Sequence, residues 1–240
     1  MPHEVIPFLA VGWREPSKDV LVAWDARMEN YLNRLPPKLR LPGDCQHGEI
    51  ELLASGGVDA SQAFGIIYED AYIMLVRDQV RFPSGKLGAY IRIVEKGELE
   101  GQSGTVMLPI VENQVASVHI FRHATRTWEW ELIRGFQEPG MSDVENAVRE
   151  TKEELGVEPE SVERIGSIKP NTGLLSGEAS VFLVRLPQEA LHNAHGESEE
   201  GIRQIQFVAC DKLDLFLLEN VTCGFSLSAV LLARLHHKIP

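Results

Sequence analysis

The sequence contains no run of about 18 apolar residues, the length that a membrane-spanning helix needs, so we expect no membrane span. Its first residues, Met1-Pro2-His3-Glu4, lack the basic flank and the apolar stretch of a secretory signal. Only three cysteines occur, at positions 45, 210 and 223, and none belongs to a CxxC pair. We therefore expect neither a disulfide framework nor a cysteine-based zinc site, and a reducing cytoplasmic location fits best.

Positive charge is also scarce, since 23 Lys and Arg residues face 35 Asp and Glu residues and give a net charge of −12. Nucleic acid binding needs a basic surface, so we expect no nucleic acid partner. A small phosphorylated ligand stays compatible with this charge, because acidic proteins bind such ligands through divalent cations. The HExxH motif and the GxGxxG motif are both absent, which disfavours a zinc protease and a Rossmann domain.

The first sixty residues differ from the rest of the chain. Apolar residues at helical spacing predict an amphipathic helix over Ser17–Leu35, which Pro36-Pro37 would end. A loop-rich stretch with Pro42-Gly43 and Gly56-Gly57 follows. We therefore predict an N-terminal extension, residues 1–62, and a catalytic domain, residues 63–240.

From residue 64 the pattern becomes rich in β-strands with few, separated helices. Strands are predicted over 64–76 and 89–95 around a turn at Pro83-Ser84-Gly85, and over 105–109, 116–122, 127–132, 162–168, 179–185 and 204–209. Helices are predicted after residue 142 and near 212–219 and 226–236. This order favours an α/β sandwich of the α+β type with a mixed sheet, rather than a doubly wound sheet.

The helix after residue 142 carries the strongest chemical signal. Ser142 followed by Glu145 is a capping box, so the helix should begin at Asp143, and Gly156 suits a left-handed residue after its end. Val144, Val148, Thr151 and Leu155 are predicted to pack on the sheet.

The same helix carries three carboxylates on adjacent turns: Glu150, Glu153 and Glu154. The carboxylates repel one another, and a bound cation would offset this repulsion. Oxygen ligands at this spacing suit Mg²⁺ or Mn²⁺. The plain alternative is a solvated acidic helix face.

The longer segment resembles the Nudix box, G-x5-E-x7-R-E-U-x-E-E-x-G-U, in which U is hydrophobic. Gly135, Arg149, Glu150, Glu153, Glu154, Gly156 and Val157 match it, and Thr151 is acceptable at the first U. The resemblance implies a Nudix α/β/α sandwich with Glu150, Glu153 and Glu154 as metal ligands and Arg149 orienting them. One position departs: Met141 stands where the box has a glutamate. Glu138 and Glu145 are nearby substitutes, and the position of Glu145 four residues before Arg149 would allow it to hold that arginine.

Upstream, Phe121-Arg-His and Trp130-Glu-Leu-Ile-Arg-Gly135 resemble the segments that precede the box in ADP-ribose pyrophosphatases. That resemblance implies that Arg122 and Glu131 contact substrate and that the Arg134 carbonyl helps to bind metal. It also implies a general base in a late acidic loop, where Glu199 and Glu200 are the candidates, and a homodimer. The SQPWPFP string of NADH-cleaving relatives is absent, while Asn171-Thr172-Gly173 replaces the SPG string of ADP-ribose enzymes.

These residues predict a metal-dependent hydrolase that cleaves the pyrophosphate bond of a nucleoside diphosphate linked to another group, with ADP-ribose or a related sugar nucleotide as substrate. The alternative is a Nudix fold that Met141 has impaired, which binds a nucleotide metabolite and regulates a partner. A third reading is an acidic scaffold that binds neither metal nor nucleotide.

Overall fold

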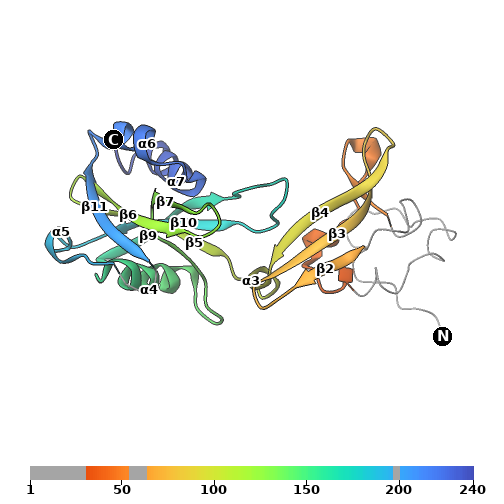
Figure 1. The fold of residues 1–240 in the computed structure, drawn as a ribbon, viewed down its shortest axis with the longest axis horizontal. Helices are drawn as coiled ribbons and strands as arrows, with labels where there is room; N and C mark the ends of the chain where they lie inside the picture. Colours follow the sequence, from red (N-terminus) through yellow and green to blue (C-terminus); the bar gives the residue numbers. More distant parts are fainter. Residues whose placement is uncertain (1–30, 54–63, 197–200) are drawn as a thin grey trace. The chain divides into compact units, whose positions relative to one another are not determined.

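The computed structural model of the chain describes residues 31–53, 64–196 and 201–240 (Figure 1). They form two compact units. The first contains the described residues up to Gly101 together with Asn171–Ser176, and the second contains the rest, from Gln102 onward. The predicted boundary between residues 62 and 63 lies outside the described residues, as does most of the predicted helix over 17–35, so both stay predictions.

The first unit is built on an antiparallel sheet in which the long strand β3 pairs with three others. Its strands are β1 (Glu51–Leu52), β2 (Gly65–Glu69), β3 (Ile73–Arg81) and β4 (Leu87–Glu95). The prediction of one strand over 64–76 was wrong, because a turn at Asp70 divides it. The Asp70 carboxylate accepts hydrogen bonds from the backbone N–H groups of Tyr72 (2.7 Å) and Ile73 (2.9 Å), a turn that aspartate favours.

A buried polar network ties this sheet to the segment before it. Asp78 is almost fully buried on β3 and receives hydrogen bonds from Tyr31 (2.8 Å) and from the Arg92 guanidinium (2.6 and 3.0 Å). Arg92 also donates to the Leu39 carbonyl at 2.9 Å. A buried charge is tolerated only when it is paired and hydrogen-bonded in this way. The network therefore fixes residues 31–40 on the sheet.

The second unit is built on a mixed sheet. Its strands run in the order β11-β6-β5-β10-β9, with β7 added to β6 and β8 added to β5. β10 pairs with β5 in parallel, and the other pairs are antiparallel. The bounds are β5 (Gly104–Val111), β6 (Gln114–Arg122), β7 (Thr127–Glu131), β8 (Arg134–Phe136), β9 (Ser161–Ile168), β10 (Ala179–Arg185) and β11 (Ile202–Ala209).

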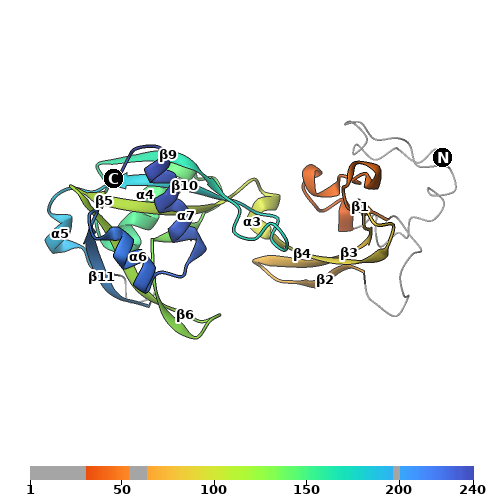
Figure 2. The ribbon, with the colours of Figure 1, turned by 90° about the horizontal axis from the view of Figure 1, so that it is seen from above.

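Helices cover both faces of this sheet (Figures 1 and 2). One apolar core forms between the sheet and α6 (Leu213–Asn220) with α7 (Gly224–Leu235), and another forms on the α4 (Asp143–Leu155) side. Two short α-helices, α3 (Lys96–Leu99) in the first unit and α5 (Ala190–Asn193) in the second, and two 3₁₀-helices, η2 (Pro37–Arg40) and η3 (Cys45–His47), complete the described elements. The predicted α/β/α sandwich with a mixed sheet is confirmed. None of the helices in the described ranges combines the length and apolar character that a bilayer crossing requires.

Helix α4 begins and ends where the sequence predicts. The Ser142 hydroxyl accepts from the Glu145 N–H, the Glu145 carboxylate accepts from the Ser142 N–H, and Gly156 adopts φ 67°. The predicted packing face is only partly correct, because Thr151 and Leu155 are buried whereas Val144 is 46% exposed. The buried face is centred on Ala147 and includes carboxylates, so Val144 lies at its rim, in the first turn.

Candidate functional site

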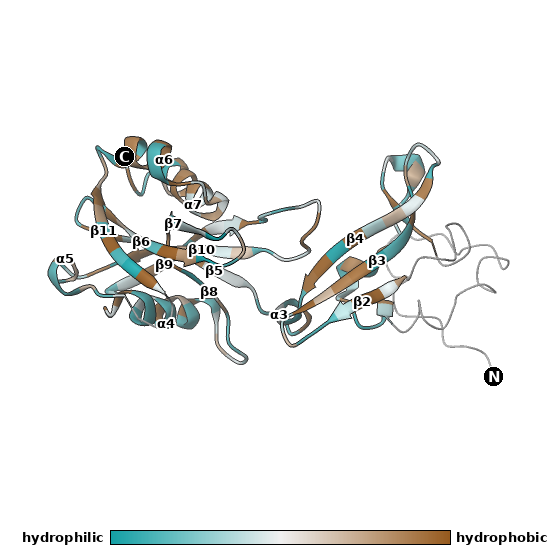
Figure 3. Ribbon diagram, viewed as in Figure 1, coloured by the Kyte–Doolittle hydropathy of each residue, from teal (hydrophilic) through white to brown (hydrophobic). Residues whose placement is uncertain are grey.

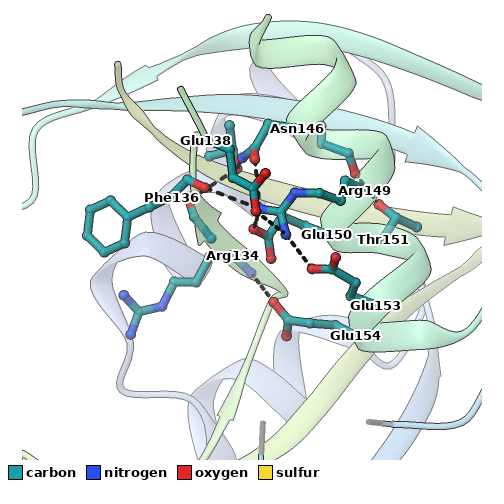
Figure 4. Close-up of polar contacts among 12 residues, drawn as sticks. Arg134, Phe136, Glu138, Asn146, Arg149, Glu150, Thr151, Glu153 and Glu154 are labelled. Atoms are coloured by element: carbon teal, nitrogen blue, oxygen red, sulfur yellow. Dashed lines mark hydrogen bonds and ion pairs between the residues drawn. The ribbon is translucent and has the colours of Figure 1, made fainter. Parts of the chain in front are cut away.

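Arg149 lies at the centre of the carboxylates that α4 presents (Figure 4). Its guanidinium forms ion pairs with Glu150 and with Glu153 (2.5 Å), and the Glu138 carboxylate lies 3.7 Å away. Partial burial lowers the pKa of Arg149, but the bond to Glu153 and the charge of Glu150 outweigh this and raise it. The arginine therefore stays charged and holds these carboxylates together.

Gly135 allows Glu150 to lie against β8. A β-carbon built on Gly135 would overlap the Glu150 carboxylate, so any residue other than glycine would displace that group. Gly135 does not have a positive φ, which means that close approach and not backbone conformation requires the glycine here. The position of the Glu150 carboxylate therefore depends on the glycine at position 135.

Glu154 is held by the same strand. Its carboxylate accepts a hydrogen bond from the Arg134 backbone N–H at 3.1 Å, and the residue is 4% exposed. Glu153 differs, because its side chain is 44% exposed. Two of the three predicted metal ligands are therefore fixed against β8 while the third lies at the surface of α4.

Asn146 belongs to this arrangement, although the sequence analysis did not single it out. It is fully buried, accepts a hydrogen bond from Arg149 (2.9 Å) and donates one to the Thr105 hydroxyl (2.8 Å). Thr105 in turn donates to the Gly135 carbonyl at 3.2 Å. This chain of bonds connects the arginine to the sheet. A polar residue inside the apolar face of a predicted helix was the signal that could have found it.

Met141 lies at the box position where a carboxylate is expected. Its carbonyl accepts a hydrogen bond from the Gln137 side chain, and its N–H donates to the Glu138 carbonyl at 3.2 Å. Of the two predicted substitutes, Glu138 is the one near Arg149, whereas the Glu145 carboxylate bonds Ser142 in the helix cap.

Arg122, Glu131 and Arg134 form a second charged group. The Glu131 carboxylate is 4% exposed and accepts from Arg122 (2.7 and 3.1 Å) and from Arg134 (3.1 Å). Burial raises the pKa of Glu131, but the hydrogen bonds and charges of the two arginines outweigh burial and hold it below its usual value. The Arg134 guanidinium also lies over the Phe225 ring, 5.0 Å from its centre. Burial lowers the pKa of Arg122, but its hydrogen bond to Glu131 and the charges of Glu131 and Glu154 outweigh burial and raise it.

The donor set has the chemistry of a hard cation site. Glu150, Glu153 and Glu154 offer carboxylate oxygens, and such ligands suit Mg²⁺ or Mn²⁺. Within the described residues, no three Asp, Glu, His or Cys side chains already surround a point where an ion would sit. A carboxylate can bond an arginine and a cation at once, so the residues fit a cation that binds beside Arg149.

An open cavity of about 530 Å³ borders the outer face of α4. It is lined by Glu145, Val148, Arg149, Lys152, Glu153, Gly156 and His195. His195 covers the end of the helix, because its backbone N–H donates to the Leu155 carbonyl (3.1 Å) and a β-carbon on Gly156 would overlap its ring. Glu199 and Glu200, the candidates for the general base, lie outside the described residues.

Comparisons with known proteins agree with this geometry. A family model described as the NUDIX domain matches residues 102–222, half of the chain. The crystal structure of an ADP compounds hydrolase is similar in fold, with a TM-score of 0.58 and 18% sequence identity. The similarity covers 74% of this chain and 97% of that one. No curated protein matches this chain significantly in sequence.

Proposed function

The chain belongs to the Nudix hydrolase family, and from that premise we propose that it hydrolyses the pyrophosphate bond of a nucleoside diphosphate linked to another moiety. The observation that carries the proposal is the arrangement around Arg149, which gathers Glu150 and Glu153 beside Glu154 on a helix facing the glycine of the box. ADP-ribose or a related sugar nucleotide is the proposed substrate. The fold similarity to an ADP compounds hydrolase supports that class.

We propose Mg²⁺ or Mn²⁺ as the cofactor, held by Glu150, Glu153 and Glu154 with help from the Arg134 carbonyl. Since the N–H and C=O of one strand residue point to the same side, the bond from the Arg134 N–H to Glu154 supports this role of its carbonyl. When bound, such an ion neutralises phosphate charge and lowers the pKa of water. Arg149 and Asn146 are the positioning residues in this proposal, because they fix the carboxylates without contacting substrate.

The substrate would lie against the second charged group. Arg122 and Arg134 supply guanidinium groups, which bind phosphate oxygens in bidentate fashion, and Glu131 fixes their orientation. We keep Glu199 or Glu200 as the proposed general base. A cytoplasmic location also stays a prediction of the sequence.

The test is a hydrolysis screen over ADP-ribose, other sugar nucleotides, dinucleoside polyphosphates and NADH, with products identified by mass spectrometry. ADP-ribose should yield AMP and a sugar phosphate, only with Mg²⁺ or Mn²⁺ present. Glu154→Gln should lower kcat by about 100-fold or more, because it removes charge at the reacting group. Glu160→Gln, which changes an exposed residue beyond the helix, is the matched control and should leave kcat unchanged. If the wild-type protein cleaves no member of the screen, the proposal fails.

A second function follows from Met141. A Nudix fold without that carboxylate can bind a nucleotide metabolite without turning it over, and it would then regulate a partner. Calorimetry would show binding of ADP-ribose with no product, and Met141→Glu would introduce turnover. Turnover by the wild-type protein would exclude this reading.

A further inference from the structure

Four aromatic side chains gather on the hairpin that β6 and β7 form. In the register of the two strands, His119 lies opposite Trp130. Phe121 lies opposite Trp128 in the same way, so the four side chains share one face of the hairpin, and we call them the aromatic platform. Trp128 is 43% exposed, and the other three are partly buried. We propose that the aromatic platform binds a free nucleotide, at a site separate from the catalytic carboxylates.

The rings of the platform form one connected surface. The His119 ring stacks on the Trp130 ring, with the ring centres 4.6 Å apart and the planes at 15°. The Trp128 ring lies 5.3 Å from that of His119 and 5.6 Å from that of Phe121. Burial and the charge of Arg203 lower the pKa of His119, so its ring is neutral at pH 7. A neutral imidazole beside two indoles offers a flat surface on which a nucleobase stacks.

The platform lies on the opposite face of the sheet from α4. Val115 precedes His119 by four residues on β6 and so points to the same face, and it packs in the core under α6 and α7. Trp130 continues this face, because its ring meets the edge of the Phe216 ring of α6 at 5.6 Å. Val118 points to the other face and packs in the core on the α4 side. Since α4 and the α6–α7 pair cover opposite faces (Figures 1–3), a ligand on the platform is separated from the carboxylates of α4 by the sheet.

Two arginines bring positive charge to the platform. The Arg203 guanidinium lies over Trp128, 5.5 Å from the ring centre. The Arg126 guanidinium lies over Phe121 at 5.1 Å and also bonds the His123 ring at 2.8 Å. Arg126 adopts φ 61°, a left-handed conformation that is uncommon for residues other than glycine. Guanidinium groups bind phosphate and the rings bind a base, so the two features together select a nucleotide.

The charges favour a free nucleotide over RNA. One phosphate needs few basic groups, whereas RNA needs a basic groove that follows its backbone. The net charge of −12 opposes the approach of such a polyanion. Glu129, which lies between the two tryptophans in β7, adds a negative charge whose effect reaches His119. The ligand that fits is therefore small, with one base and a short phosphate group.

Isothermal titration calorimetry of the full chain with AMP tests the proposal. AMP has a base and a phosphate but no pyrophosphate bond, so the proposed reaction does not consume it. The wild-type protein should bind AMP with a dissociation constant below about 1 mM. Adenosine, which lacks the phosphate, and ribose 5-phosphate, which lacks the base, should each bind at least about 10-fold more weakly.

Variants of the platform separate the two parts of the ligand. Trp128→Ala removes the most exposed ring and should weaken AMP binding by about 10-fold or more, whereas Trp128→Phe should retain most of the affinity. Arg203→Gln should weaken the binding of AMP but not that of adenosine, because only AMP carries a phosphate. Tyr72→Ala changes an aromatic residue of the first unit that is 78% exposed, and this matched control should bind AMP like the wild type. Unchanged circular dichroism would establish that each variant is folded.

Four results would overturn the proposal. A wild-type protein that does not bind AMP has no such site. Ribose 5-phosphate that binds as tightly as AMP reveals an anion site that does not recognise a base. Binding that Glu154→Gln removes and Trp128→Ala leaves intact places AMP at the catalytic carboxylates. An oligoadenylate that binds more tightly than AMP identifies RNA as the ligand. None of these measurements depends on hydrolysis, so their outcome is separate from that of the proposed activity.

Discussion

Replacing Gly135 by alanine should lower kcat by about 100-fold while it leaves the fold intact. The added β-carbon would lie 2.0 Å from the carboxyl carbon of Glu150, whereas two carbon atoms in contact lie about 3.5 Å apart. The carboxylate must therefore move by roughly 1.5 Å. The move costs the fold little, because the carboxylate ends a flexible side chain and Gly135 needs no positive φ. A misplacement of about 1 Å near the reacting group lowers the rate by about 100-fold.

The measurement pairs kcat with the midpoint of thermal unfolding. Gly135→Ala should lose about 100-fold in kcat with a small change in the midpoint. Gly104→Ala is the matched control, since Gly104 lies on β5 opposite β8 and its new β-carbon would lie 3.3 Å from the β-carbon of Ala179, not near a carboxylate. It should keep wild-type kcat. If Gly135→Ala retains wild-type kcat with the same metal requirement, Glu150 does not act where the structure holds it and the reasoning is refuted.

Three further predictions concern stability, measured by urea unfolding. Glu131→Gln should lose about 1–3 kcal/mol at pH 7, because it weakens the bonds from the half-buried Arg122. The pKa of Glu131 is lowered in the folded state, so this stabilisation is present above its unfolded pKa of about 4.3 and disappears as the pH falls through the folded value. A difference from wild type that does not shrink as the pH falls below about 4.3 would contradict the assignment. Tyr31→Phe should lose about 1.5–3 kcal/mol with its bond to the buried Asp78, and an unchanged midpoint would mean that the network does not hold residues 31–40. Ser142→Ala should lose about 1 kcal/mol by removing the cap of α4.

The elements that the sequence predicts best are those whose ends depend on local chemistry. Both ends of helix α4 are determined by residues at those ends, the capping box at Ser142 and the left-handed Gly156. The hairpin β5–β6 turns at Glu112 and Asn113, between the strands predicted over 105–109 and 116–122, and Glu112 adopts φ 51° there. These features depend only on residues that are neighbours in the chain, so they can be predicted from the sequence.

What the sequence does not predict depends on residues far apart in the chain. Val144 looks like a core residue by spacing, yet the helix turns its carboxylates to β8 because Gly135 leaves room for them. Asn146 gains its role from Thr105, which lies 41 positions away. The membership of Asn171–Ser176 in the first unit likewise depends on a distant strand, since the Ile93 N–H of β4 donates to the Leu174 carbonyl at 2.8 Å.

The Nudix box also has features that the local sequence predicts and features that depend on distant residues. Its spacing predicts that Glu150, Glu153 and Glu154 lie on adjacent turns, and the structure places them there. The spacing does not predict which of these carboxylates is buried or which of them Arg149 bonds, because both depend on β8. The spacing favoured Glu145, four residues before Arg149, as the substitute that holds this arginine, and that prediction was wrong. The helix cap engages the Glu145 carboxylate, and Glu138 is the substitute that lies near Arg149.

The position of Arg149 makes the folding of the protein independent of the proposed metal ion. If a bound ion were the only group that neutralised the buried carboxylates of Glu150 and Glu154, these carboxylates would repel each other without it. Proteins of that kind unfold when the ion is withdrawn. Here a positive charge that belongs to the chain already occupies the middle of the acidic group. The folded domain can therefore exist before the proposed cation binds, and that ion would be a reagent that the protein takes up and releases.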